Sequence, residues 1–125
     1  MRNEKFKIID FIRQLIVSVD TELENFPNKE LELKRRISNN SYDILEIAYK
    51  ANSIQDIKEK VSLLNAILAK IKVIDFLLNL ANDKQLITKK KYVKLAERID
   101  DITKYTCGWM NSLTKNEMKQ NIINS

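Results

Sequence analysis

The sequence contains no histidine, and its 125 residues include one cysteine, one glycine and one proline. Without histidine, Ser-His-Asp triads, Cys-His pairs and the commonest transition-metal ligand are all missing. A single glycine cannot build a P-loop or a Gly-x-Gly-x-x-Gly dinucleotide loop. So few turn-forming residues also speak against an all-β fold, which needs a turn every 8–12 residues or so. The composition therefore favours an all-α protein with no metal or nucleotide cofactor.

The remaining candidates for catalysis are weak. Asp100 and Asp101 are adjacent, so on a helix their side chains point about 100° apart and do not converge on one substrate. Cys107 has no histidine partner, and we interpret it as a small buried hydrophobe rather than a nucleophile. We expect no enzymatic activity and no cofactor.

Features of targeting or membrane insertion are also missing. The first 13 residues are interrupted by charged side chains, and no apolar run approaches the ~20 residues of a membrane span. Unpaired cysteine suits a reducing compartment. We expect a cytoplasmic protein with no membrane contact.

Three breaks separate four long periodic segments, which predicts helices near residues 3–25, 28–51, 54–83 and 88–114. Pro27 cannot lie inside a helix, Ser53 with Asp56 three residues later resembles a capping box, and Thr88 is a suitable N-cap. Connections of a few residues force sequential helices to run antiparallel. The predicted fold is an up-down-up-down four-helix bundle over residues 1–115, followed by a polar, frayed tail over residues 116–125.

Two of the predicted helices carry apolar residues on two faces. In the 28–51 helix we expect the core face to contain Leu33, Ile37, Asn40, Ile44, Ile47 and Ala51. Additional apolar and aromatic residues repeat on the outer faces of this helix and of the 54–83 helix: Leu31, Tyr42, Leu45, Tyr49, Val73, Phe76 and Leu80. A helix that is apolar all round is usually buried all round, so these residues predict an oligomer interface. Scattered surface hydrophobics are the alternative.

The basic residues gather in two clusters on a chain with 22 Lys and Arg, 17 Asp and Glu, and a formal charge of +5. Cations at a helix N-terminus are disfavoured by the positive end of the macrodipole. Together with the free backbone N–H groups there, however, they can bind a phosphate. Tyr105 shares a helix flank with the second cluster and could stack on a base. The candidate nucleic-acid-binding residues are Lys34, Arg35, Arg36, Lys89, Lys90, Lys91, Lys94 and Arg98. A solvated lysine-rich face is the alternative.

Near the end of the 88–114 helix, Gly108 and Trp109 predict a structural feature. A glycine lets a neighbouring backbone approach closely, and a large indole can close the end of a bundle. We assign Trp109 to the stability of the fold rather than to nucleic-acid recognition.

Several short stretches resemble the accessory variability determinant (Avd) proteins of diversity-generating retroelements, within a group of bacterial four-helix proteins that includes those encoded in ribosomal RNA intervening sequences. The resemblance spans residues 6–113, and its most specific part is the Gly-Trp pair. The stretches that carry it are Phe26-Pro27, Leu63-Leu64-Asn65-Ala66, the 76–81 segment, Tyr92, Ile99-Asp100-Asp101-Ile102 and Cys107-Gly108-Trp109.

The resemblance implies a non-catalytic accessory protein. Avd-like proteins form basic homopentamers of four-helix protomers, bind nucleic acid and associate with the retroelement reverse transcriptase, which copies template RNA into mutagenic complementary DNA. Where relatives tend to carry arginine on the third helix, this chain has Asp75 and Asn79, so we expect the nucleic-acid contacts on the second and fourth helices. The alternative is a structural oligomeric scaffold of the intervening-sequence type.

Overall fold

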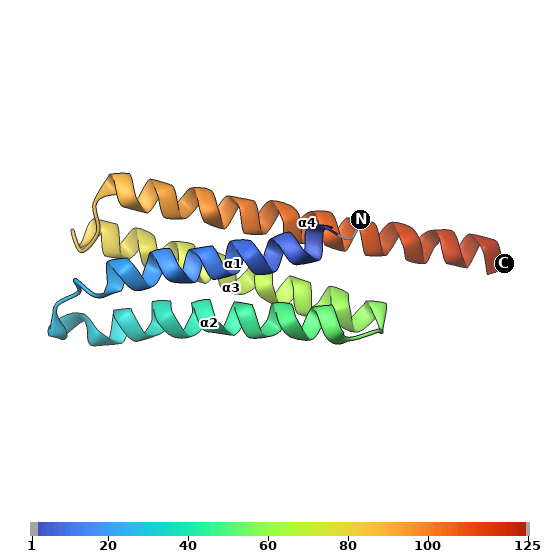
Figure 1. Ribbon diagram of the computed structural model, residues 1–125, viewed down its shortest axis with the longest axis horizontal. Helices are drawn as coiled ribbons and strands as arrows, with labels where there is room; N and C mark the ends of the chain where they lie inside the picture. The colour runs from blue at the N-terminus through green and yellow to red at the C-terminus, as the bar shows by residue number, and fades with distance from the viewer. Residues whose placement is uncertain (1–2, 125) are drawn as a thin grey trace.

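The computed structural model describes the backbone of residues 3–124 and the side chains of residues 7–116, 118 and 119. Four helices dominate it: α1 (Asn3–Leu23), α2 (Leu31–Ser53), α3 (Ile57–Asp83) and α4 (Lys89–Asn124). A short 3-10 helix, η1 (Asn28–Glu30), precedes α2 (Figure 1). The described residues contain no strand, so the predicted all-α class is confirmed.

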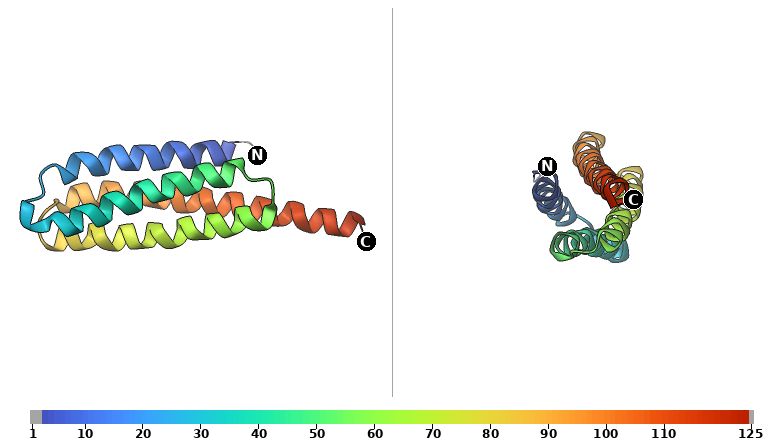
Figure 2. Two further views of the ribbon diagram at one scale, coloured as in Figure 1. Left: turned by 90° about the horizontal axis from the view of Figure 1, so that it is seen from below. Right: turned by 90° about the vertical axis from the view of Figure 1, so that its right-hand side faces the viewer.

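The helices run alternately up and down and pack in chain order around one core (Figure 2). α1 contacts α2 and α4, and α3 also contacts α2 and α4, whereas the diagonal pairs do not touch over the described residues. The predicted antiparallel four-helix bundle is therefore confirmed. In this arrangement α1 and α4, which are the first and last helices of the chain, lie side by side.

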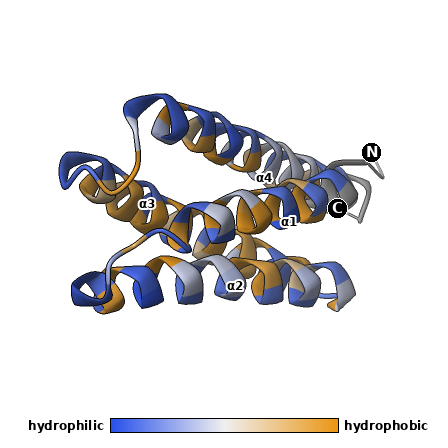
Figure 3. Cartoon of the chain, turned by 60° about the vertical axis from the view of Figure 1, so that its left-hand side comes forward, coloured by the Kyte–Doolittle hydropathy of each residue, from blue (hydrophilic) through white to orange (hydrophobic). Residues whose placement is uncertain are grey.

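The core is built almost entirely from aliphatic side chains. Each helix turns an apolar face inward and a polar face outward, as Figure 3 shows. The bulkiest fully buried side chains are isoleucines and leucines from all four helices, together with one valine: Ile8, Ile12, Leu15, Val19, Ile37, Ile44, Leu64, Ile67, Ile71, Ile74, Leu78 and Ile102. Burying a side chain of this size stabilises a fold by about 1.5–3 kcal/mol before conformational entropy is subtracted.

The buried face of α2 differs at two positions from the expected one. Ser41 and Ala48 are buried, whereas Asn40 and Ile47 are only half-buried. Small side chains at positions 41 and 48 let neighbouring helices come close, and the Ser41 hydroxyl donates to the Ile37 carbonyl at 2.7 Å, so its burial leaves no unpaired donor. The helical spacing therefore placed this face one residue too early at each of these two positions.

The helix starts use the predicted breaks, with one correction. Pro27 lies in extended conformation directly before η1, as expected for a residue that cannot continue a helix. The Thr88 hydroxyl accepts a hydrogen bond from the Lys91 backbone N–H at 3.2 Å, which confirms Thr88 as an N-cap. The cap of α3 is Asp56, whose carboxylate accepts from the Glu59 backbone N–H at 3.0 Å. Ser53 is instead the last residue of α2.

The turn from α3 to α4 ends the helix without a glycine. Gln85 has a φ of 64°, in the left-handed region that normally favours glycine. The Leu86 backbone N–H donates to the Ala81 carbonyl at 2.9 Å, which closes a Schellman-type turn. The Asn82 side-chain amide then donates to the Ile87 carbonyl at 3.0 Å, and Ile87 is buried. The buried Ile87 side chain and these two hydrogen bonds thus stabilise the left-handed conformation of Gln85, which a glutamine in the sequence does not predict.

The fourth helix is longer than expected. It continues to Asn124 rather than ending near residue 114, and its last turns project beyond the other three helices (Figures 1 and 2). Residues 115–124 contain no glycine or proline to stop a helix, and several of them have high helix propensity. The tail over residues 116–124 is therefore helical rather than irregular.

Trp109 lies near the end of the bundle where α2 meets α3, and it is 7% exposed. The ammonium nitrogen of Lys60 is 5.5 Å from the centroid of the indole ring and also donates to the Ala51 carbonyl at 2.7 Å. Gly108 lies inside α4 without a positive φ, so the backbone conformation does not require glycine there.

Replacing Trp109 with alanine should lower the free energy of unfolding by about 3–5 kcal/mol, because the substitution leaves a large cavity beside the α2–α3 connection. Urea denaturation followed by circular dichroism measures the change. Met118→Ala is the control, since Met118 is well exposed on the projecting part of α4. A Trp109→Ala protein as stable as the control would contradict the structural assignment.

Candidate nucleic-acid interface

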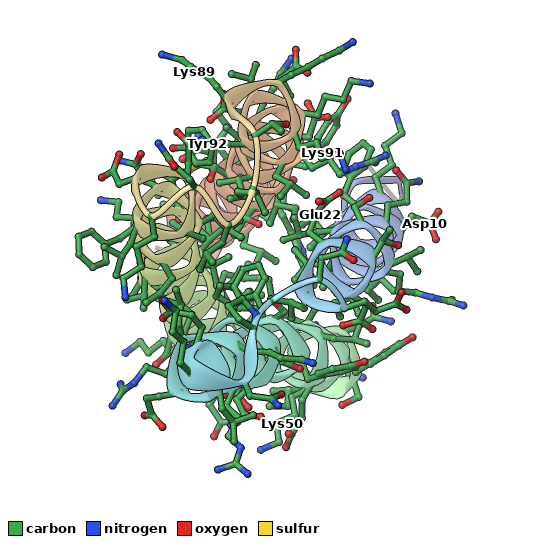
Figure 4. The ribbon with its side chains drawn as sticks, turned by 90° about the vertical axis from the view of Figure 1, so that its left-hand side faces the viewer. Asp10, Glu22, Lys50, Lys89, Lys91 and Tyr92 are labelled. Carbon is green, nitrogen blue, oxygen red and sulfur yellow. The ribbon has the colours of Figure 1, made fainter. Side chains whose placement is uncertain are left out.

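The two clusters of predicted cations reach the same end of the bundle but lie on diagonal helices. α1 and α3 end where α2 and α4 begin, so Lys34–Arg36 and Lys89–Lys91 lie in the opening turns of α2 and α4. Figure 4 views this end and shows Lys89 pointing outward from α4, on the side away from α2. The clusters therefore do not form a single patch within one protomer.

The structure also separates paired from unpaired cations in the fourth helix. Lys91 forms an ion pair with the mostly buried Glu22 of α1 at 3.4 Å, and Figure 4 shows both side chains between the two helices. Lys89, Lys90 and Lys94 are exposed, and among the described residues none of them has a carboxylate within salt-bridge distance. These three ammonium groups are free to bind an external anion.

On the second helix, Arg36 is paired with Glu32 of the same helix at 2.9 Å. Arg35 is exposed and has no ion pair within the described part of the chain, whereas Lys34 is half-buried. Exposed ion pairs of this kind contribute little to stability, so Arg36 can exchange Glu32 for a phosphate at small cost. Arg35 is the least constrained cation of this cluster.

A groove between α1 and α4 adds a residue that the sequence pattern did not reveal. Two hollows of about 330 and 390 Å³ adjoin there, because Val17, Ser18 and Arg98 line both of them. Lys91 and Lys94 line the first hollow, and Arg13 lines the second. Arg13 is isolated from other basic residues in the sequence, so only the pairing of α1 with α4 brings it to this set.

Tyr105 is less available for base stacking than its helix position suggested. Its ring lies 5.3 Å from the ring of Phe11, in a tilted arrangement. The ammonium nitrogens of Lys7 and Lys104 lie 5.2 and 5.9 Å from the Tyr105 ring centroid. The half-buried ring thus helps to join α1 to α4, and two lysines already lie near it.

The residues predicted for an oligomer interface lie on the outer faces of α2 and α3. Leu31, Tyr42, Tyr49, Val73 and Phe76 are exposed, Phe76 most of all at 64%. Leu45 and Leu80 are half-buried and also pack against the core. A hollow of about 580 Å³ on α2 is lined by Tyr42, Leu45, Glu46, Tyr49, Lys50 and Ser53.

Two tyrosine hydroxyls are bound to carboxylates of neighbouring helices. The Tyr92 hydroxyl donates to Asp75 at 3.0 Å, and burial, this hydrogen bond and nearby carboxylates raise the pKa of Tyr92. The Tyr42 hydroxyl donates to Asp20 at 3.1 Å, and this hydrogen bond with the Asp20 charge raises the pKa of Tyr42. Asp75 thus has a role in joining α3 to α4.

Other classes of site find little support in the described residues. These residues include no group of three or more Cys, Asp or Glu side chains placed to hold a metal ion. Within the same range, no helix is both long enough and apolar enough to cross a membrane.

The fold and the distribution of charge define a basic four-helix protein with an exposed apolar face and unpaired surface cations. The chain belongs to the bAvd-like family, whose model matches residues 3–113. The match ends before the projecting turns of α4. No curated protein and no solved structure gave a significant match to the chain.

Substituting Lys89 with glutamine should leave stability unchanged or raise it by up to ~1 kcal/mol, because an unpaired cation in the first helical turn opposes the macrodipole. Lys91→Gln is the matched comparison in the same turn. The gain in stability of the Lys91→Gln variant should be smaller or absent, because Glu22 would lose its ion pair with Lys91. Urea denaturation at low salt measures both values, and an equal gain from the two variants would show that the Lys91–Glu22 pair has no energetic role.

Proposed function

We propose that the protein is a non-catalytic accessory factor of a diversity-generating retroelement. In this role it forms a basic oligomer that binds nucleic acid and the retroelement reverse transcriptase. The oligomer supports mutagenic synthesis of complementary DNA from template RNA, and the polymerase chemistry belongs to the reverse transcriptase.

The observation that carries this proposal beyond family membership is the set of cations without partners. A chain that uses its lysines only for solubility gains nothing by concentrating three of them in the opening turns of a helix, where the macrodipole disfavours them. Lys89, Lys90 and Lys94 nevertheless remain exposed and unpaired within the described structure. Binding of a polyanion accounts for this cost, because phosphate contacts release condensed counterions and gain affinity.

The exposed apolar residues of α2 and α3 support an oligomer, for which we propose a homopentamer. Phe76 is a large apolar knob on α3, and the hollow between Tyr42 and Tyr49 is an apolar recess on α2. We propose that Phe76 of one protomer enters the recess of the next protomer in a head-to-tail interface, because such an interface gives a closed ring when the rotation between protomers closes. Burial of Phe76 would also remove apolar surface that a monomer usually avoids exposing.

The combined variant Lys89→Gln, Lys90→Gln and Lys94→Gln should weaken binding to RNA of any sequence. At ~0.7–0.9 counterions for each phosphate contact, losing three contacts reduces the slope of log K against log salt by about 2–3. Fluorescence anisotropy with labelled RNA at several salt concentrations measures the slope. Synthesis of complementary DNA by the co-expressed reverse transcriptase should fall in parallel.

The control for this experiment removes the same charge from other exposed positions: Lys58→Gln, Lys72→Gln and Lys115→Gln. Its binding and slope should change much less than those of the helix-start variant. If the two triple variants have the same slope, the lysines of α4 are a solvated face, and the structural-scaffold function becomes the better proposal.

Phe76→Ser should shift the protein from a pentamer toward smaller species, because the serine removes the apolar knob from the proposed interface. Tyr49→Ser should act in the same direction by opening the recess. Light scattering after size-exclusion chromatography gives the mass at micromolar concentration. Val93→Ser, at an exposed apolar position of α4 away from this face, is the control. A wild-type protein of monomer mass would refute the assembly.

A further inference from the structure

We propose that the α1–α4 groove is a binding site for single-stranded nucleic acid, in which Arg13, Lys94 and Arg98 bind phosphates of the strand. This inference rests on the proposed nucleic-acid-binding function and specifies where on the protomer, and on which form of nucleic acid, that function acts. It adds to the cations at the start of α4 a second set at the seam between the first and last helices, with Lys94 common to both sets.

The charges in the middle of the groove are uncompensated. Arg13 and Lys94 are exposed and have no ion pair among the described residues. Arg98 donates from Nη1 to the Gln14 side-chain oxygen at 2.9 Å, so its only described hydrogen-bond partner is a neutral amide that positions the guanidinium without cancelling its charge. Two arginines and a lysine therefore converge from two helices with their charges available.

The carboxylates of the groove lie toward its ends. Glu22 lines the first hollow and is already paired with Lys91, and Asp10 lines the second hollow. A polyanion can therefore lie along the middle of the groove without meeting an unpaired carboxylate until it reaches Asp10. At ~1.5 Å per residue, the stretch of α1 from 10 to 22 is about 18 Å long. This length matches about five phosphates of a stacked strand at ~3.4 Å each.

An exposed apolar side chain lies between the cations of the groove. Val17 is 68% exposed, although it lies on a helix whose other described valine, Val19, and isoleucines are buried. Val17 lines both hollows beside the Ser18 side chain, so an apolar contact and a hydroxyl lie between the cations. Proteins that bind single strands combine a cationic groove with side chains that pack against the faces of the bases, usually aromatic ones. In this groove, Val17 supplies the apolar surface.

The size of the groove favours a single strand over a duplex. The two hollows, of about 330 and 390 Å³, reach the lower range of small-ligand sites and can each admit a nucleotide-sized group. A duplex has its bases paired inside a rod, so it would offer no base to pack against Val17. A single strand can place a sugar or a base in these open hollows, against Val17.

The test is the double variant Arg13→Gln and Lys94→Gln, with Lys58→Gln and Lys72→Gln as the control of equal charge. For a short single-stranded oligonucleotide, the groove variant should lose on the order of tenfold in affinity at low salt, and its salt slope should fall by about 1.4. The control should change by much less. Equal losses in both variants would overturn the groove as the binding site.

A second readout does not depend on charge. In a Cys107→Ser background, Val17→Cys places a thiol in the lining of the groove, and Gln55→Cys places one at an exposed position between α2 and α3. A saturating single-stranded oligonucleotide should slow maleimide labelling of position 17 severalfold and leave position 55 unchanged. Equal labelling at position 17 with and without the oligonucleotide, or equal protection by a duplex, would overturn the proposal.

These experiments distinguish a failure of the proposed nucleic-acid-binding function from a failure of the groove assignment. If the wild-type protein binds neither single strands nor duplexes, the proposed function itself fails. If it binds nucleic acid but the groove variant matches its control and position 17 is not protected, the function stands and the groove assignment fails.

Discussion

The fold depends on the seam between α1 and α4, because no short connection joins these two helices. The other three adjacent pairs are consecutive in the chain and are held together by short connections, whereas α1 and α4 stand at its two ends. Their pairing relies on the shared aliphatic core and on cross-seam contacts. These contacts are the Phe11–Tyr105 ring pair, the Lys91–Glu22 ion pair and the Arg98–Gln14 hydrogen bond. The same seam also carries three cations that have no ion pair among the described residues, Arg13, Lys94 and Arg98.

The sequence predicted the fold well because the features that determine it are local and periodic. Apolar spacing, Pro27 and the cap at Thr88 each act over a few residues, and each is confirmed. The errors arose where local signals compete. The centre of the buried α2 face follows small side chains at Ser41 and Ala48 rather than the larger Ile47, and α4 continues because nothing in its last residues stops it.

The candidate site was less accessible from sequence, since it depends on which helices meet. Arg13 is an isolated cation in the sequence and becomes part of a cluster only through the α1–α4 pairing. The reverse holds for Lys91 and Tyr105, which share a helix flank with the other candidates but already have partners on α1. Helix spacing identifies the residues on one face, but it cannot say which opposite charge or ring the neighbouring helix supplies.

The order of helices around the bundle also makes the two proposed interactions compatible. α2 and α3 form one side and α4 and α1 form the opposite side, because the diagonal pairs do not touch. An assembly through Tyr49 and Phe76 would use the outer faces of α2 and α3, whereas the groove is lined by residues of α1 and α4. Each added protomer would contribute another open groove, so weak phosphate contacts on single protomers would add up along one bound strand. Arg35 is different, because it lies on the outer face of α2 near the proposed subunit contact, and assembly would restrict its access to a strand.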